Sequence, residues 1–239
     1  MEKKIILWIK KQFKKSKAKG IVLGLSGGID SALAAALSVK AVGRKKVLGL
    51  LLPCESDPQD LCDAKLVAKK LGIKTYTVDL TKIFKELLKI LPEGSKLSKA
   101  NIKPRLRMLV LYYFANNLNY LVCGTSNKSE RLVGYFTKFG DSAADILPLA
   151  DLLKKQVRIL AQRLHLPERI INKTPTAGLW PGQTDENEMG IGYDELDDIL
   201  ERLEQKKRQS AAREKVFKVK KMFKDSEHKR QSPAICKIS

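Results

Sequence analysis

The sequence contains no apolar run long enough to cross a membrane. A membrane-spanning helix needs about 20 consecutive apolar residues. The first twenty residues have too short an apolar stretch, and no small-residue cleavage site, to form a signal peptide. We therefore expect a cytoplasmic protein with no membrane partner.

Cysteine and histidine are too scattered to form the common zinc or redox motifs. The chain contains Cys54, Cys62, Cys123 and Cys236, with no CxxC spacing and no histidine partner close in sequence. This pattern argues against zinc fingers and thioredoxin-like motifs. We expect reduced, mostly buried thiols, as in a reducing compartment.

Aromatic residues form only 6% of the chain, although its net charge is +20. So large a positive charge by itself favours a nucleic-acid partner. However, residues 1–19 and 202–239 account for +16 of it, and no basic stripe with interleaved aromatic residues is present. We interpret the charge as solvated helix faces and expect no nucleic-acid partner.

The features that are present predict one α/β domain. Short β-rich runs alternate with helical patterns, which predicts an open parallel sheet with helices on both faces. The predicted strands are 21–26, 47–53, 74–80 and 120–126, and the predicted helices are 29–41, 58–71, 101–118 and 151–164. Right-handed crossovers place the carboxyl ends of all four strands at one edge, where ligands bind.

Three segments are expected within this single domain of residues 1–239. Residues 1–19 form an amphipathic helix with Ile5, Ile6, Ile9 and Phe13 on one face. Residues 20–200 form the core, and residues 201–239 form basic helices and a tail.

Two stretches, 127–145 and 172–192, show no helical or strand periodicity. Long irregular segments in a compact domain are often functional lids. We expect both stretches to be mobile without ligand.

The stretch "GLSGGIDSA" at 24–32 stands between an apolar strand and an alanine-rich helix. Gly27 and Gly28 allow close approach of a ligand to the backbone, and the helix start offers free N–H groups. Asp30 would repel a bare phosphate, which implies Mg²⁺ between them. The loop lacks the lysine that stabilises a departing γ-phosphate, so it suits a whole pyrophosphate and cleavage at the α-phosphate. A simple strand-to-helix turn is the alternative.

The motif SGGxDS identifies the loop as similar to that of the ATP pyrophosphatase (PP-loop) superfamily. The blocks "NIKPRLRM", "GTSNKSERLVGYFTKFGD", "LPLADLLKKQV" and "KTPTAGLWPGQTDENEMGIGYDELDDIL" resemble those of the NAD⁺ synthetase family in the same order. The resemblance covers about residues 20–200, with a weaker echo in "EHKR" at 227–230.

This resemblance implies a Rossmann-like, adenine nucleotide alpha hydrolase-like fold and a ligase that forms a carbon–nitrogen bond. Such an enzyme uses ATP and Mg²⁺ to amidate deamido-NAD⁺ with ammonia through an acyl-adenylate, giving NAD⁺, AMP and pyrophosphate. The family also implies a homodimer. The phosphate loop begins about twenty residues into the sequence. We therefore expect no preceding amidase domain, and ammonia from solution or from a separate amidotransferase.

The resemblance also implies the roles of individual residues. Asp30 and Lys154 would be catalytic, and Asp30 and Glu130 would bind the metal. ATP would be bound by Gly24, Leu25, Ser26, Gly27, Gly28, Ile29, Asp30, Ser31, Thr125, Lys154 and Thr176. Deamido-NAD⁺ would be bound by Arg105, Lys138, Asp145, His228 and Lys229.

The residues alone favour a different interpretation at two of these positions. Arg105 and Lys154 fall in helical patterns, where basic side chains are usually solvated. The family also has glycines where this chain reads "GDSAAD", so Ser142 and Ala143 should stiffen that loop. They would strain it if either position required positive φ.

Two other functions remain open from the residues. A PP-loop enzyme that modifies tRNA is favoured by the charge, but paired catalytic cysteines and an appended RNA-binding domain are missing. A non-catalytic nucleotide-binding protein would need neither Glu130 nor the "FTKFGD" loop.

Overall fold

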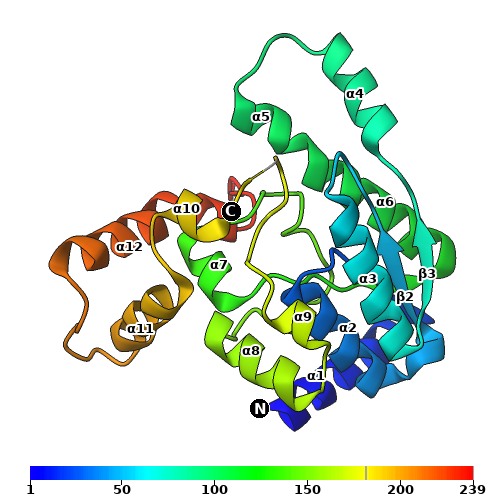
Figure 1. Ribbon diagram of the computed structural model, residues 1–239, viewed down its shortest axis with the longest axis horizontal. Coiled ribbons are helices and arrows are strands. Elements are labelled where there is room, and N and C mark those ends of the chain that lie inside the picture. Colours follow the sequence, from blue (N-terminus) through cyan, green and yellow to red (C-terminus); the bar gives the residue numbers. More distant parts are fainter. Residues whose placement is uncertain (181, 239) are drawn as a thin grey trace.

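A four-stranded parallel sheet forms the centre of the protein (Figure 1). The computed structural model describes residues 1–180 and 182–238. The strand order is β3-β2-β1-β4, so the chain passes back across β1 before it forms β4. The strands are β1 (Gly20–Gly24), β2 (Val47–Leu51), β3 (Lys74–Thr77) and β4 (Tyr120–Val122). The loops that follow β1 and β4 therefore meet at the point where strand order reverses, which is where open α/β sheets bind ligands.

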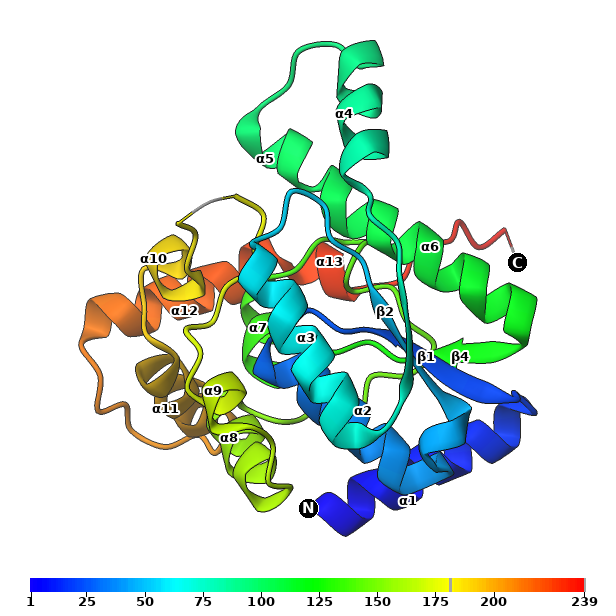
Figure 2. The same cartoon turned by 45° about the vertical axis from the view of Figure 1, so that its right-hand side comes forward.

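Helices cover both faces of this sheet, as predicted (Figure 2). One face packs against α2 (Ile29–Val42) and α3 (Pro58–Leu71), with α1 (Glu2–Ser16) outside α2. The other face packs against α4 (Thr81–Ile90) and α6 (Ile102–Leu118). The observed strands end earlier than predicted at their carboxyl ends, because the next residues already belong to the ligand-side loops.

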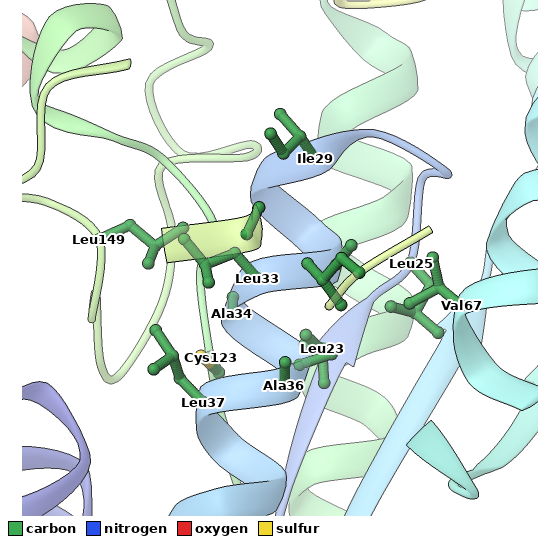
Figure 3. Packing of buried hydrophobic residues seen from close by; sticks show 14 of the residues in the cluster. Leu23, Leu25, Ile29, Leu33, Ala34, Ala36, Leu37, Val67, Cys123 and Leu149 are labelled. Atoms are coloured by element: carbon green, nitrogen blue, oxygen red, sulfur yellow. The ribbon is translucent and has the colours of Figure 1, made fainter. Parts of the chain in front are cut away.

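The alternation of side chains along β1 explains the two layers. Leu23 belongs to the core cluster that contains α2, whereas Val22 belongs to the cluster that contains α6. Both are fully buried. Leu33 and Leu37 extend from α2 toward Leu149, and the alanines between them let the helix pack closely (Figure 3). This packing fixes the start of α2 against the end of β1.

Helix α3 begins and ends at the residues predicted, 58 and 71. Asp57 accepts a hydrogen bond from the backbone N–H of Gln59 at 2.8 Å, Pro58 occupies the first helical position, and Gly72 ends the helix with φ +63°. Proline lacks an N–H that the first turn would leave unpaired in any case. The boundaries of this helix could therefore be predicted from local signals.

Several helices lie where the sequence pattern indicated none, and α9 (Glu168–Ile171) is one of them. Residues 81–100 had no assignment and contain α4 and α5 (Lys96–Ala100). The stretches expected to be irregular contain α7 (Lys128–Val133) and α10 (Asp185–Met189). The short helices α5, α7 and α10 do not repeat a hydrophobic period often enough to be recognised. In contrast, α4 does carry apolar residues at helical spacing, and this pattern was overlooked. That part of the prediction was wrong.

A smaller core joins the C-terminal helices beside the sheet (Figure 1). The side chains that pack together there include Val133 of α7, Leu196 and Ile199 of α11 (Tyr193–Glu204), and Val219. The remaining elements are the 3-10 turn η1 (Arg44–Lys46), α8 (Lys154–Arg163), α12 (Arg213–Asp225) and α13 (Glu227–Arg230).

Two further expectations concern the whole chain. Cys54 and Cys123 are buried, but Cys62 and Cys236 are exposed, so the expectation of mostly buried thiols holds for only half of them. Within residues 1–180 and 182–238, every helix is too short or too polar to cross a membrane.

Candidate functional site

The loop between β1 and α2 is held in one shape by its own hydroxyl groups. The Ser31 hydroxyl donates to the Gly28 carbonyl at 2.9 Å and lies 3.1 Å from the Ser26 hydroxyl. Gly27 has φ +79°, and a Cβ there would lie 2.5 Å from the Asp60 carbonyl oxygen. This glycine is therefore required both by its backbone angle and by the approach of α3.

Lys154 is buried between two carboxylates at the start of α8. Its Nζ lies 2.6 Å from Oδ2 of Asp30 and 3.4 Å from Oε1 of Glu130, and its side chain is only 2% exposed. Burial alone would lower the pKa of this lysine, but the charges of Asp30 and Glu130 raise it above its ordinary value. Lys154 is thus a buried cation, and the interpretation of it as a solvated helix residue was wrong.

Asn127 fixes the two carboxylates relative to each other. Its side-chain amide donates to Oδ1 of Asp30 at 2.9 Å, and its carbonyl oxygen accepts the Glu130 N–H at 2.9 Å. Glu130 in turn accepts the Asn127 N–H at 3.3 Å, which completes a capping box at the start of α7. Burial, followed by the nearby charge of Asp30, raises the pKa of Glu130 above its usual range.

Two residues of α11 support this cluster, and the sequence analysis assigned a role to neither. The Tyr193 hydroxyl donates to Oδ2 of Asp185 at 2.8 Å and lies 3.4 Å from Oε1 of Glu130. Asp197 accepts hydrogen bonds from the Ser129 hydroxyl at 2.5 Å and from the Lys155 N–H at 2.8 Å. Their spacing of four residues places both on one helix face, which is the only signal that could have linked them.

A cavity of about 440 Å³ opens at this cluster. Its walls include the loop after β1, the carboxyl end of β2, the residues after β4 and the 172–192 stretch. Of the residues predicted to bind ATP or metal, the cavity is lined by Gly24, Leu25, Ser26, Gly28, Ile29, Asp30, Ser31, Thr125, Glu130, Lys154 and Thr176. Gly27 is the exception, because it faces α3 instead.

A second cavity, of about 380 Å³, adjoins the first at Lys229. Four basic residues line it, namely Arg131, Lys138, Lys229 and Arg230. Of the five residues predicted to hold the second substrate, two line this cavity, Lys138 and Lys229, and Arg105 and His228 contact Lys138. Arg105 donates to the Lys138 carbonyl at 3.3 Å, and Lys138 Nζ donates to the His228 carbonyl at 2.5 Å.

The chain matches the family model described as NAD synthase over residues 1–233. It belongs to the NAD synthase family. It is 48% identical over 225 residues to the NH3-dependent NAD⁺ synthetase of Archaeoglobus fulgidus, covering 93% of this chain and 90% of that protein. Members of the family are ligases that form a carbon–nitrogen bond and use ATP as a substrate.

Two solved structures resemble this chain over nearly its full length. The NMN synthetase of Francisella tularensis has a TM-score of 0.91 at 40% identity, covering 98% of this chain and 96% of that chain. The NH3-dependent NAD synthetase of Campylobacter jejuni has a TM-score of 0.86 at 31% identity, covering 99% and 97%. The predicted sheet with helices on both faces is therefore confirmed as the fold of this family.

Asp145 is a predicted substrate residue whose carboxylate is engaged by the protein itself. Its Oδ2 accepts the Val122 N–H at 2.7 Å, and its Oδ1 accepts the Tyr112 hydroxyl at 3.3 Å. The carboxylate thus completes the hydrogen bonding of β4, and it lines neither cavity. Ser142 and Ala143, which replace the usual glycines, both avoid positive φ, so this part of the loop carries no backbone strain.

Arg107 lines the larger cavity, although the sequence analysis did not select it. Its guanidinium donates to the Leu52 carbonyl at 3.1 Å and to the Ser56 hydroxyl at 3.2 Å. Burial lowers the pKa of this arginine below its ordinary value. It therefore fixes the loop after β2 at the wall of the larger cavity.

The donor set fits Mg²⁺ only as part of a nucleotide complex. Asp30 and Glu130 offer two carboxylates, one on either side of the Lys154 ammonium. Within residues 1–180 and 182–238, no group of three or more His, Cys, Asp or Glu residues is placed to hold a metal ion. Mg²⁺ commonly takes one or two carboxylates and completes its shell with phosphate oxygens and water. The residues present fit that mode of binding.

Proposed function

We propose that this chain is an ammonia-dependent NAD⁺ synthetase that amidates the nicotinate carboxylate of deamido-NAD⁺. The observation that carries this proposal is the placement of Lys154 between Asp30 and Glu130. This cluster stands beside a glycine loop that lacks a lysine of its own. Such an arrangement suits cleavage at the α-phosphate of ATP, with AMP and pyrophosphate as products.

The reaction needs adenylation because a carboxylate is a poor electrophile. Transfer of AMP from ATP to a carboxylate oxygen supplies a leaving group that ammonia can displace. The glycine loop and the first N–H groups of α2 would hold the β- and γ-phosphates. Lys154 would stabilise the charge that develops on the α-phosphate, since its ammonium group is buried and needs little reorganisation.

Asp30 and Glu130 would hold Mg²⁺ together with the phosphates. When bound, the metal would neutralise phosphate charge and orient the triphosphate for in-line attack. The Lys154 ammonium contacts the same two carboxylates and lies within 3.4 Å of each. Thr125 and Thr176, which both line the cavity, would bind the rest of the nucleotide.

The second cavity would hold the dinucleotide. Its four basic side chains suit the pyrophosphate of deamido-NAD⁺. Lys229 lines both cavities and so stands where the two substrates would meet. Its Nζ already donates to the Gly134 and Phe136 carbonyls at 2.8 and 3.0 Å, which fixes its direction.

A second candidate substrate is nicotinate mononucleotide. The high similarity to a protein named NMN synthetase favours it, whereas the basic second cavity favours a dinucleotide. The test compares kcat/KM for both substrates with ATP, Mg²⁺ and ammonium. We expect at least about tenfold preference for deamido-NAD⁺, which corresponds to about 1.4 kcal/mol from one additional phosphate contact.

The variant Lys138→Met sharpens this comparison. It should lower kcat/KM for deamido-NAD⁺ and leave that for nicotinate mononucleotide unchanged, because Lys138 lines only the second cavity. If the unmodified enzyme has an equal or higher kcat/KM for nicotinate mononucleotide, that compound replaces deamido-NAD⁺ as the proposed substrate.

The enzyme would act in the cytoplasm as a homodimer. Four free cysteines are compatible with a reducing compartment. Tyr76, Leu109 and Tyr113 are each more than half exposed, and the latter two lie on α6. Such a set of apolar side chains could pack across a two-fold axis. Light scattering should give about twice the chain mass of 26.8 kDa, and a value near one chain would contradict the dimer.

A further inference from the structure

Tyr193 is among the largest side chains that are completely buried. Its hydroxyl reaches two carboxylates, Asp185 at 2.8 Å and Glu130 at 3.4 Å. Its ring lies under Lys154, whose Nζ is 4.8 Å from the ring centroid. One buried side chain therefore touches both the proposed phosphate-binding lysine and one of the proposed metal ligands.

The chemistry of this contact is that of a fixed donor. A phenol hydroxyl is protonated at neutral pH and can donate one hydrogen bond. The hydroxyl thus keeps its proton, and a single proton is shared between two carboxylates. The electron-rich ring face also attracts the ammonium group above it.

The same helix supports Lys154 a second time through the backbone. Asp197, one turn after Tyr193 on α11, accepts a hydrogen bond from the Ser129 hydroxyl. That hydroxyl accepts the Lys154 N–H at 3.0 Å. The start of α8 and the lysine side chain are thus both held by one face of α11. Asp185, in contrast, belongs to the 172–192 stretch.

We propose that Tyr193 is a positioning residue for the nucleotide and metal site. Its ring and hydroxyl hold Lys154 and Glu130 in place, and Asp185 orients the hydroxyl from the 172–192 stretch. This inference deepens the proposed function and rests on it for the roles of Lys154 and Glu130. It makes the geometry of the phosphate site depend on the placement of a segment that lines the cavity.

The first test is the variant Tyr193→Phe, which keeps the ring and removes only the hydroxyl. Loss of a hydrogen bond to a charged group should lower kcat about tenfold or more, with the KM for deamido-NAD⁺ unchanged. Tyr120→Phe is the matched control, since Tyr120 begins β4 and lines neither cavity. The control should keep the kcat of the unmodified enzyme.

A second readout requires no turnover. The thermal midpoint is measured with α,β-methylene-ATP, which resists cleavage at the α-phosphate, in the presence of either Mg²⁺ or EDTA. Binding to the native state raises the midpoint. In Tyr193→Phe the extra rise caused by Mg²⁺ should shrink by at least half, while the ligand-free midpoint stays within about 2 °C.

Asp185→Asn tests the orientation of the hydroxyl. It should lower kcat in the same direction, and the double variant should be no worse than Tyr193→Phe, because both changes break one linked contact. Unchanged kcat and an unchanged Mg²⁺-dependent rise in Tyr193→Phe would overturn the proposal. The proposal would also be overturned if the thermal midpoint of ligand-free Tyr193→Phe fell so far that unfolding accounted for all of the lost activity. If the unmodified protein forms no NAD⁺, the proposed function fails, whereas the Mg²⁺-dependent rise still decides the role of Tyr193.

Discussion

Lys154 Nζ lies 2.6 Å from Oδ2 of Asp30, although 124 positions separate the two residues in sequence. Asp30 lies in the first turn of α2 after the first strand, and Lys154 begins α8 after the last strand. The reversal of strand order between β1 and β4 brings these two helix starts together. The contact therefore joins the phosphate loop to the second half of the chain.

Replacement of Lys154 should lower both turnover and stability, unlike replacement of an exposed lysine. Lys154→Gln should lower turnover by about 10² or more, because it removes a buried cation beside the reacting phosphate. It should also lower the free energy of unfolding by about 3 kcal/mol, since two buried carboxylates lose their partner. Steady-state kinetics and urea unfolding measure the two effects.

The adjacent Lys155 provides a matched control. Its side chain is 39% exposed and pairs with Glu201, so Lys155→Gln should change the free energy of unfolding by about 1 kcal/mol or less. Equal loss of turnover in both variants would contradict the special position of Lys154.

Asp30→Asn should weaken the binding of Mg²⁺. Turnover should fall by about 10² or more, and half-maximal activity should require more Mg²⁺. Folding should change little, because Lys154 keeps Glu130 as a partner. A Mg²⁺ titration of activity measures the shift, with Asp194→Asn as control, since Asp194 is 86% exposed. A fully active Asp30→Asn enzyme would mean that the metal is held elsewhere.

The four thiols should divide into two classes. Burial raises the pKa of Cys123 to about 12 and also raises that of Cys54, whereas Cys62 and Cys236 are exposed. Because the thiolate is the reactive form, only the two exposed thiols should react promptly with a disulfide reagent at pH 8. Spectrophotometry should count two thiols in native protein and four in denaturant. Four prompt reactions in native protein would contradict the described burial.

The 127–145 and 172–192 stretches should be the first sites of limited proteolysis. The second stretch should be cut faster, because Gly178 and Gly182 both adopt positive φ there, whereas Ser142 and Ala143 replace glycines in the first. ATP and deamido-NAD⁺ together should suppress both cuts, since an acyl-adenylate must be shielded from water. Equal cutting with and without the two ligands would exclude a lid.

Much of the fold could be predicted because its signals are local. Each strand is recognisable from a short β-rich run. The start of α3 at Pro58 and its end before Gly72 are likewise recognisable from a few neighbouring residues. The same held for the phosphate loop, whose glycines and hydroxyls are contiguous. In contrast, α7 was missed although Asn127 and Glu130 have the spacing of a capping box, because a helix of six residues is too short to show periodicity.

The support of the site could not be predicted in the same way. Nothing near Lys154 in sequence indicates its burial, which depends on Asp30 and Glu130 from two other loops. Tyr193 and Asp185 likewise acquire their roles only when α11 packs against α7 and α8. Local patterns assign such side chains to a helix face or a loop, and only the tertiary structure shows what they contact.

The most direct test of the central claim follows an oxygen atom. Deamido-NAD⁺ labelled with ¹⁸O in both carboxylate oxygens is incubated with the protein, ATP, Mg²⁺ and ammonium, and the nucleotides are analysed by mass spectrometry. Adenylation of the carboxylate transfers one of its oxygens to the phosphate of AMP when ammonia displaces it. The account predicts one AMP per NAD⁺, with one ¹⁸O in each AMP. Accumulation of ADP, or unlabelled AMP formed in step with NAD⁺, would contradict it.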